Sequence, residues 1–185
     1  MLNMSWACRF FNLFLDVPWL AMKTLFLLRH AKASKDDPAL PDLKRPLSER
    51  GFSDARVVSE ALRQQDLIPE KIISSNAVRA YTTAFVFAAT FEKVSGDIEL
   101  TETLYDCTEK EYLEAIAGIS NEFSSCMIAG HNDTISQVAD TLTGKNLEAM
   151  NTCSVIVIRS EADTWAEFDS SPCKLLMRLD PSDLR

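Results

Sequence analysis

Glycine, which most phosphate-cradling loops require, is scarce in this sequence. The chain has five glycines among its 185 residues, and none of them forms a Gly-x-Gly pair or a P-loop. Loops that wrap a nucleotide need glycine because their backbone must come close to the phosphate oxygens. The common nucleotide-binding loops are therefore absent.

Positive charge is also scarce, and it is unevenly distributed. The chain has 19 Lys and Arg against 27 Asp and Glu, a formal net charge of -8. A general nucleic-acid partner is not expected, because phosphate neutralisation needs a basic face. Between residues 23 and 50, however, seven Lys and Arg stand against four acids, a local excess of +3. Alone, such a run is more often a solvated surface than a binding site.

Cysteine gives no sign of a disulfide framework or of a zinc site. The five cysteines are scattered along the chain, odd in number, and include no Cys-x-x-Cys pair. Paired spacing would be expected for either kind of cross-link. The simplest interpretation is a protein of the reducing cytoplasm, and we predict that localisation.

A long uninterrupted hydrophobic run is missing as well. Residues 1–21 are apolar and aromatic, but Asp16 and Pro18 interrupt them. A membrane-spanning helix needs about 20 predominantly apolar residues, and a secretory signal would have a stronger basic region. We interpret residues 1–21 as an N-terminal extension before a natural start at Met22, and residues 22–185 as one domain without a membrane partner.

Short apolar runs alternate with helical patterns along the rest of the chain. The runs predict strands at 23–28, 71–74 and 126–129, and helical spacing predicts helices from the N-cap Ser48 to about 65, and over 77–92, 109–119 and 134–142. Residues 99–105 are predicted to be extended or irregular. Residues 154–159 and 165–169 are predicted to form an edge hairpin with its turn at 161–164. Alternation of this kind predicts a three-layer α/β/α sandwich with a mostly parallel central sheet.

The only two histidines of the chain both follow predicted strands. His30 comes directly after the run TLFLLR, and His131 directly after CMIAG. Arg79 lies just past the strand KIIS, in the first turn of the next helix. The carboxyl ends of parallel strands border the ligand crevice, so we expect these side chains at one edge of the sheet.

Two arginines and two histidines at one edge suit the chemistry of a phosphoryl group. Arg29 and Arg79 can clamp its oxygens, because guanidinium geometry matches them bidentately. One histidine can attack phosphorus as a neutral imidazole while the other, protonated, shares the developing charge. An alternative interpretation is that the two histidines and Asp133 bind a metal ion. The adjacent Arg29 argues against it, because a guanidinium repels a cation.

Four motifs resemble those of the histidine phosphatase superfamily, which includes the cofactor-dependent phosphoglycerate mutases. They are LLRHAKAS, KRPLSERGFSDA, SSNAVRAYTTA and AGHN, which lie between Thr24 and Asn132. Ala31 stands where the family commonly has Gly, and Asn76 where Pro is frequent. The small size and the Arg-Pro-Leu run are most similar to the bacterial phosphohistidine phosphatase subgroup.

This resemblance implies a phosphoglycerate mutase-like fold and assigns roles to the residues above. His30 would be the phosphorylated nucleophile, and Arg29, Arg79 and His131 would hold the phosphate without a metal or any cofactor. The implied substrate is a phosphomonoester or phosphohistidine, carried by a phosphorylated small molecule or a phosphohistidine protein. Arg45, with Lys44 beside it, would extend the positive rim toward the substrate or be a solvated loop residue.

The superfamily also implies a carboxylic acid that protonates the leaving oxygen. In the segment IELTETLYDCTEKEY we assign this role to Glu102, with Glu99 and Asp106 as rivals. A surface role for Glu102 is an equally open alternative, because acids are frequent along this chain. A good leaving group such as imidazole would depend less on the acid.

Two other functions remain open from the sequence. A mutase-type phosphoryl transfer would need a segment that caps the site, and only short loops separate the predicted elements around it. A non-catalytic module that binds a phosphorylated ligand would not need the nucleophile His30. We therefore expect an enzyme, a phosphoric monoester hydrolase or phosphohistidine phosphatase.

Overall fold

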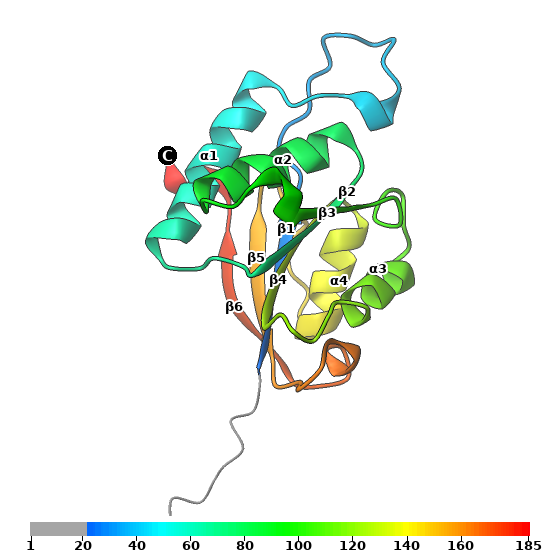
Figure 1. Ribbon diagram of the computed structural model, residues 1–185. Helices are drawn as coiled ribbons and strands as arrows, with labels where there is room; N and C mark the ends of the chain where they lie inside the picture. Colours follow the sequence, from blue (N-terminus) through cyan, green and yellow to red (C-terminus); the bar gives the residue numbers. More distant parts are fainter. Residues whose placement is uncertain (1–21) are drawn as a thin grey trace, which may run out of the picture.

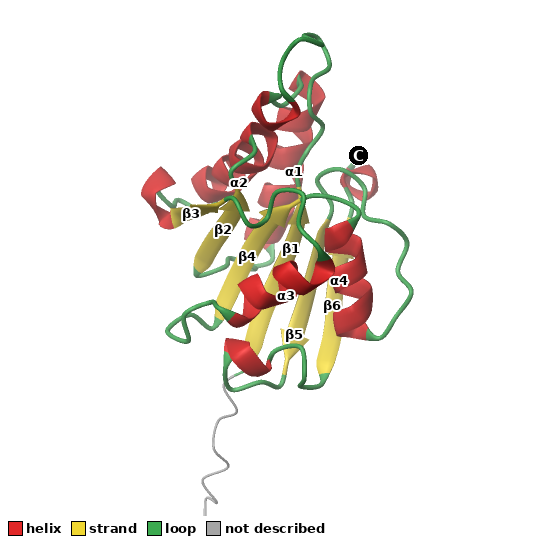
Figure 2. Ribbon diagram, turned by 90° about the vertical axis from the view of Figure 1, so that its right-hand side faces the viewer, coloured by secondary structure: helices red, strands yellow, loops and turns green. Residues whose placement is uncertain are grey.

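A six-stranded sheet with two helices on each face organises the computed structural model, which describes residues 22–185 (Figures 1 and 2). This is the expected three-layer architecture. The strands are β1 (Lys23–Arg29), β2 (Lys71–Ser75), β3 (Ile98–Thr101), β4 (Ser125–Gly130), β5 (Val155–Ser160) and β6 (Cys173–Leu179). The helices are α1 (Glu49–Gln64), α2 (Val78–Thr90), α3 (Glu109–Ala117) and α4 (Thr134–Thr143).

The sheet has the strand order β3-β2-β4-β1-β5-β6 and is mostly parallel, as expected. Strands β3, β2, β4 and β1 pair in parallel, whereas β5 pairs antiparallel with both β1 and β6. Strand β1 therefore lies inside the sheet, directly beside β4. The carboxyl ends of β1, β2 and β4 meet at one edge.

The hydrophobic run of β1 is buried on both faces of the sheet. Phe26 and Leu28 pack into the cluster beneath α1 and α2, and Leu25 and Leu27 pack into the cluster beneath α3 and α4. A strand covered by helices on both sides has no solvent face and therefore needs no polar alternation. The sequence of β1 accordingly reads as a continuous apolar run.

Helix α1 begins where the sequence predicts it. The Ser48 Oγ accepts a hydrogen bond from the Gly51 N–H at 3.1 Å, which satisfies one of the unpaired donors of the first turn. The Ser48 Oγ also donates to the Lys32 carbonyl at 3.0 Å. The cap of α1 is thereby tied to the chain that follows β1.

The prediction for the edge hairpin was wrong in its second strand. Residues Trp165–Glu167 form a short 3-10 helix, and the partner of β5 is β6, which follows Pro172. Trp165 and Phe168 are fully buried and stacked with ring centroids 5.2 Å apart. Their burial against the α3/α4 side of the core overrides the strand preference of these aromatic residues.

Within residues 22–185 no helix is both long and apolar enough to cross a bilayer. The predicted N-terminal extension, residues 1–21, lies outside the residues that the structure describes.

Candidate active site

The structure brings both histidines and Arg79 together at the carboxyl edge of the sheet. Arg29 ends β1 directly opposite Gly130, which ends β4, so His30 and His131 leave the sheet side by side. Their ring centroids are 5.0 Å apart. Arg79 reaches the same point from the first turn of α2.

Arg79 bridges the two histidines from a buried position. Its side chain is 9% exposed. Its Nε donates to His30 Nε2 at 3.2 Å, and its Nη2 donates to His131 Nδ1 at 3.3 Å. A single fixed cation thus contacts both imidazoles.

The hydrogen bonds of His30 indicate a neutral imidazole with no proton on Nε2, whose electron pair accepts from Arg79 Nε. Nδ1 lies 2.8 Å from the Ala31 carbonyl, which can only accept, so Nδ1 carries the proton. Burial, together with the charges of Arg79 and Arg29, lowers the pKa of His30 to about 4. At neutral pH the ring is therefore in the form that a nucleophile requires.

The pKa of His131 is lowered as well. Burial, followed by the nearby His30 and Arg79, lowers its pKa to about 3. Its Nε2 lies 2.9 Å from the Ser75 Oγ, which fixes the ring. A bound dianionic phosphate would raise this pKa, because a nearby negative charge favours the protonated ring.

Two hydroxyl groups that we did not single out in the sequence hold this arrangement together. Ser75 orients His131 and accepts from the Ala77 N–H at the start of α2. Thr83 accepts from the Ala31 N–H at 3.0 Å and donates to the Arg79 carbonyl at 2.6 Å. Both belong to the motif SSNAVRAYTTA, so the signal was present in the sequence.

Arg29 forms fewer side-chain hydrogen bonds than Arg79 and lines neither of the cavities that contain His30 and His131. Its Nη1 donates to the Met150 carbonyl. Among residues 22–185 its buried Nε has no hydrogen-bond partner. Burial lowers its pKa, and the nearby Asp133 opposes that shift. Within residues 22–185 the Arg29 side chain thus forms one hydrogen bond, whereas that of Arg79 forms four.

Asp42, which we did not identify from the sequence, occupies the guanidinium of Arg79. The carbonyl and the Oδ2 of Asp42 accept from Arg79 Nη1 and Nη2 at 2.7 Å and 2.8 Å. Burial opposes its ionisation, but hydrogen bonds from Arg45 and Arg79 outweigh burial and hold the pKa of Asp42 below its usual value. Tyr105, edge-on to His131, also donates to Asp42 Oδ2 at 3.1 Å. The guanidinium of Arg79 is thus paired with a carboxylate.

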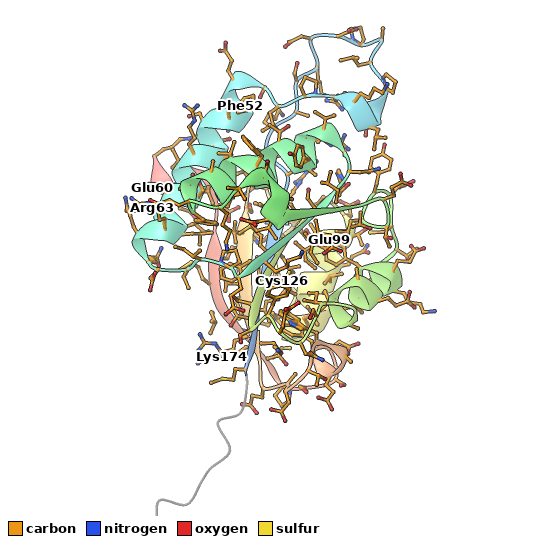
Figure 3. All side chains as sticks on the ribbon, viewed as in Figure 1. Phe52, Glu60, Arg63, Glu99, Cys126 and Lys174 are labelled. Carbon is orange, nitrogen blue, oxygen red and sulfur yellow. The ribbon has the colours of Figure 1, made fainter. Side chains whose placement is uncertain are left out.

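The candidate proton donors lie in different places. Glu102 is exposed in the turn after β3 and does not line the cavity beside His131. Glu99 is on edge strand β3 and pairs with Lys71 at 3.0 Å (Figure 3). Asp106 does line that cavity, together with Asp42. The assignment of Glu102 stays a prediction.

Two cavities meet at Arg79. The larger, of about 490 Å³, contains His131 and is bordered by Asp42, Asp106 and Asp133. The smaller, of about 200 Å³, contains His30 and is bordered by the following residues: Lys32, Ala33, Lys35, Arg45 and Thr152. Within residues 22–185, no three His, Cys, Asp or Glu side chains form a cluster that could hold a metal ion.

The family model of the histidine phosphatase superfamily, branch 1, matches residues 25–124. The chain belongs to this superfamily. The expected similarity to its small phosphohistidine phosphatases is confirmed by structures of SixA proteins. The inferred phosphohistidine phosphatase SixA of Agrobacterium tumefaciens is 27% identical, with a TM-score of 0.74 over 86% of this chain and 98% of that one.

A second SixA structure has the same fold, and a plant protein is similar in sequence. The protein histidine phosphatase SixA complexed with tungstate is 20% identical and has a TM-score of 0.75, over 88% of this chain and 99% of the other. An uncharacterized chloroplastic protein of Arabidopsis thaliana is 29% identical over 78% of this chain and 70% of its own length. The superfamily and its SixA members indicate a phosphatase.

Proposed function

We propose that the protein is a metal-independent phosphatase that works through a covalent phosphohistidine on His30. The observation that carries the proposal is the state of this imidazole: it is neutral, and its Nε2 electron pair faces Arg79. A nucleophile held against a cation is suited to attack an anionic phosphoryl group. The likeness to SixA supports phosphohistidine, beside phosphomonoesters, as the substrate class.

The proposed reaction has two steps. In the first, the phosphoryl group replaces Asp42 on Arg79, the hydrogen bond from Arg79 Nε to His30 Nε2 opens, Nε2 forms a bond to phosphorus, and the bond to the leaving oxygen or nitrogen breaks. Arg29, Arg79 and His131 balance the charge on the three phosphoryl oxygens. In the second, water gives a proton to the carboxylate that protonated the leaving group and attacks phosphorus, the P–N bond breaks, and phosphate leaves with His30 restored.

The leaving group takes its proton from a carboxylic acid, for which we propose Glu102, with Asp106 as the rival that lines the cavity. An alkoxide leaves poorly and needs this proton. The imidazole of phosphohistidine is a better leaving group, so the acid contributes less to that reaction.

Inhibition tests the proposal directly with a generic aryl phosphate as substrate. Vanadate adopts the trigonal-bipyramidal geometry of the reacting phosphorus, so we expect strong inhibition, and we expect EDTA to have no effect. His30→Ala should remove turnover while circular dichroism shows an intact fold. If EDTA removed activity and an added divalent metal restored it, the result would instead favour a metal site formed by the two histidines and Asp133.

A further inference from the structure

The two cavities on either side of Arg79 carry opposite charge. The larger has three aspartates on its wall, Asp42, Asp106 and Asp133, and Arg79 is its only Lys or Arg within residues 22–185. The smaller, which contains the nucleophile His30, has only cations among its charged wall residues. An anionic group attached to the substrate would be repelled on the first side and attracted on the second.

The backbone that carries the basic side is firmly held. The Lys32 carbonyl accepts from the Ser48 N–H at 2.9 Å and from its hydroxyl at 3.0 Å. The Ser34 N–H donates to the Pro46 carbonyl at 2.8 Å, and the Ser34 carbonyl accepts from Arg45 Nε and Nη2. These contacts fix the position from which Lys32 and Lys35 project beside His30.

Lys32 and Lys35 are not used by the fold itself. Both are exposed, and neither forms an ion pair or a side-chain hydrogen bond within residues 22–185. Arg45 differs, because its guanidinium is occupied by the Ser34 carbonyl and by Asp42. The two ammonium groups are therefore free to bind a ligand at the mouth of the smaller cavity.

We propose that Lys32 and Lys35 form a subsite for a second anionic group of the substrate, a carboxylate or a second phosphate near the transferred phosphoryl group. This inference rests on the proposed function, in which His30 receives that phosphoryl group. The second anion lies over the smaller cavity while the phosphoryl group is held by Arg79. It raises affinity and selects among phosphorylated compounds, and it takes no part in bond breaking.

Matched substrates test the subsite. Phenyl phosphate carries no second anion, whereas the 2-, 3- and 4-carboxyphenyl phosphates carry one at three distances from phosphorus. For Lys32→Gln/Lys35→Gln we expect a KM about tenfold higher for at least one carboxylated substrate, the combined effect of two exposed ion pairs. We expect kcat and the constants for phenyl phosphate to stay within about twofold.

A charge-matched control separates local from general electrostatics. Lys174→Gln/Arg159→Gln removes the same two charges from exposed, paired positions of β6 and β5, and Lys174 lies at the far end of the sheet (Figure 3). It should leave every substrate unchanged. Added salt should shrink the advantage of the carboxylated substrates in the wild type, because exposed pairs are screened.

The source of the second anion is resolved by phosphohistidine peptides with acidic or neutral flanking residues. If Lys32→Gln/Lys35→Gln raised the KM for the acidic peptide alone, the subsite would be assigned to protein substrates. If it raised the KM for the carboxyphenyl phosphates, the subsite would be assigned to small substrates. The proposal would be overturned if the lysine variant raised the KM for phenyl phosphate as much as for the carboxylated substrates. It would also be overturned if the variant raised the KM for no substrate that carries a second anion. If the wild type hydrolysed none of these compounds the proposed function would fail, and calorimetric binding of the same compounds would still test the subsite.

Discussion

Burial makes the two histidines weak bases, and this property decides their roles. Both rings are largely enclosed at the sheet edge and face the guanidinium of Arg79, so a proton on either ring would meet positive charge in a poorly solvated place. His30 is consequently ready to attack without first losing a proton. His131 becomes an effective charge partner only when an anion arrives.

Because the chain has only two histidines, their titration can be followed without ambiguity. We expect the imidazole proton resonances of the phosphate-free enzyme to titrate near pH 4 for His30 and near pH 3 for His131. Addition of vanadate or phosphate should raise the midpoint of His131. A midpoint near the ordinary value of 6.5 for either ring in the free enzyme would contradict this account.

The same pKa values predict how the stability of the fold decreases at acidic pH. Both folded-state pKa values lie below 6.5, so the unfolded chain takes up protons that the folded chain does not. The contribution of the two histidines to the free energy of unfolding is fully present above pH 6.5, and it is lost as the pH falls toward 4. We expect the melting temperature of the wild type to drop more over this interval than that of a variant with both rings replaced by Gln.

The proton donor can be identified with substrates of different leaving groups. If Glu102 is the acid, Glu102→Gln should slow hydrolysis of an alkyl phosphate by about 10²- to 10⁴-fold and affect an activated aryl phosphate or phosphohistidine little. Asp106→Asn is the matched variant. A selective loss in Asp106→Asn and none in Glu102→Gln would move the role to Asp106, and a uniform loss would indicate a role in shaping the pocket.

Among the elements, the connection from β1 to α1 controls access to the clamp. It carries Asp42, whose carbonyl and carboxylate accept from Nη1 and Nη2 of Arg79, and Arg45, whose guanidinium donates to both Asp42 and the Ser34 carbonyl. In the proposed mechanism, a substrate phosphate displaces a half-exposed carboxylate from the guanidinium. The loop is therefore a competitor of the substrate as well as a wall of the site.

Neutralising this competitor should strengthen binding of oxyanions. For Asp42→Asn we expect vanadate to inhibit about three- to tenfold more tightly, the range of a partly exposed ion pair. Asp36→Asn, which changes the same charge on the same loop, should have little effect. Weaker inhibition in Asp42→Asn would show that Asp42 positions Arg79 for phosphate instead of competing with it.

The contact between this loop and α1 depends on Gly51. A Cβ at that position would lie 2.3 Å from the Lys32 carbonyl oxygen, which is backbone and cannot turn aside. We expect Gly51→Ala to destabilise the protein by about 1–3 kcal/mol. Gly96→Ala is the control, because its Cβ would meet nothing within 4 Å. Equal melting temperatures for the two variants would contradict the close approach.

At the scale of the whole molecule, the order of strands and helices could be predicted because β1, β2 and β4 are buried runs bounded by polar residues. Because the ends of these strands could be recognised, the positions of His30, Arg79 and His131 could be predicted as well. Asp42 could not be found this way, because it begins a short 3-10 helix (Asp42–Lys44) that does not follow a strand, and its partner Arg79 is 37 residues further along the chain. The second strand of the hairpin was predicted in the wrong place. The structure around Trp165 is set by burial of its side chain in the core, which no local sequence pattern indicates.

The phosphorylated enzyme is the most direct test of the central claim. A phosphorus-labelled substrate is mixed rapidly with the enzyme and quenched in denaturant at alkaline pH, where a phosphoramidate survives, and the labelled peptide is mapped. We predict a label on His30 in the wild type and none in His30→Ala. A label on a serine or cysteine, or first-turnover product release with no label on the protein, would contradict the covalent mechanism.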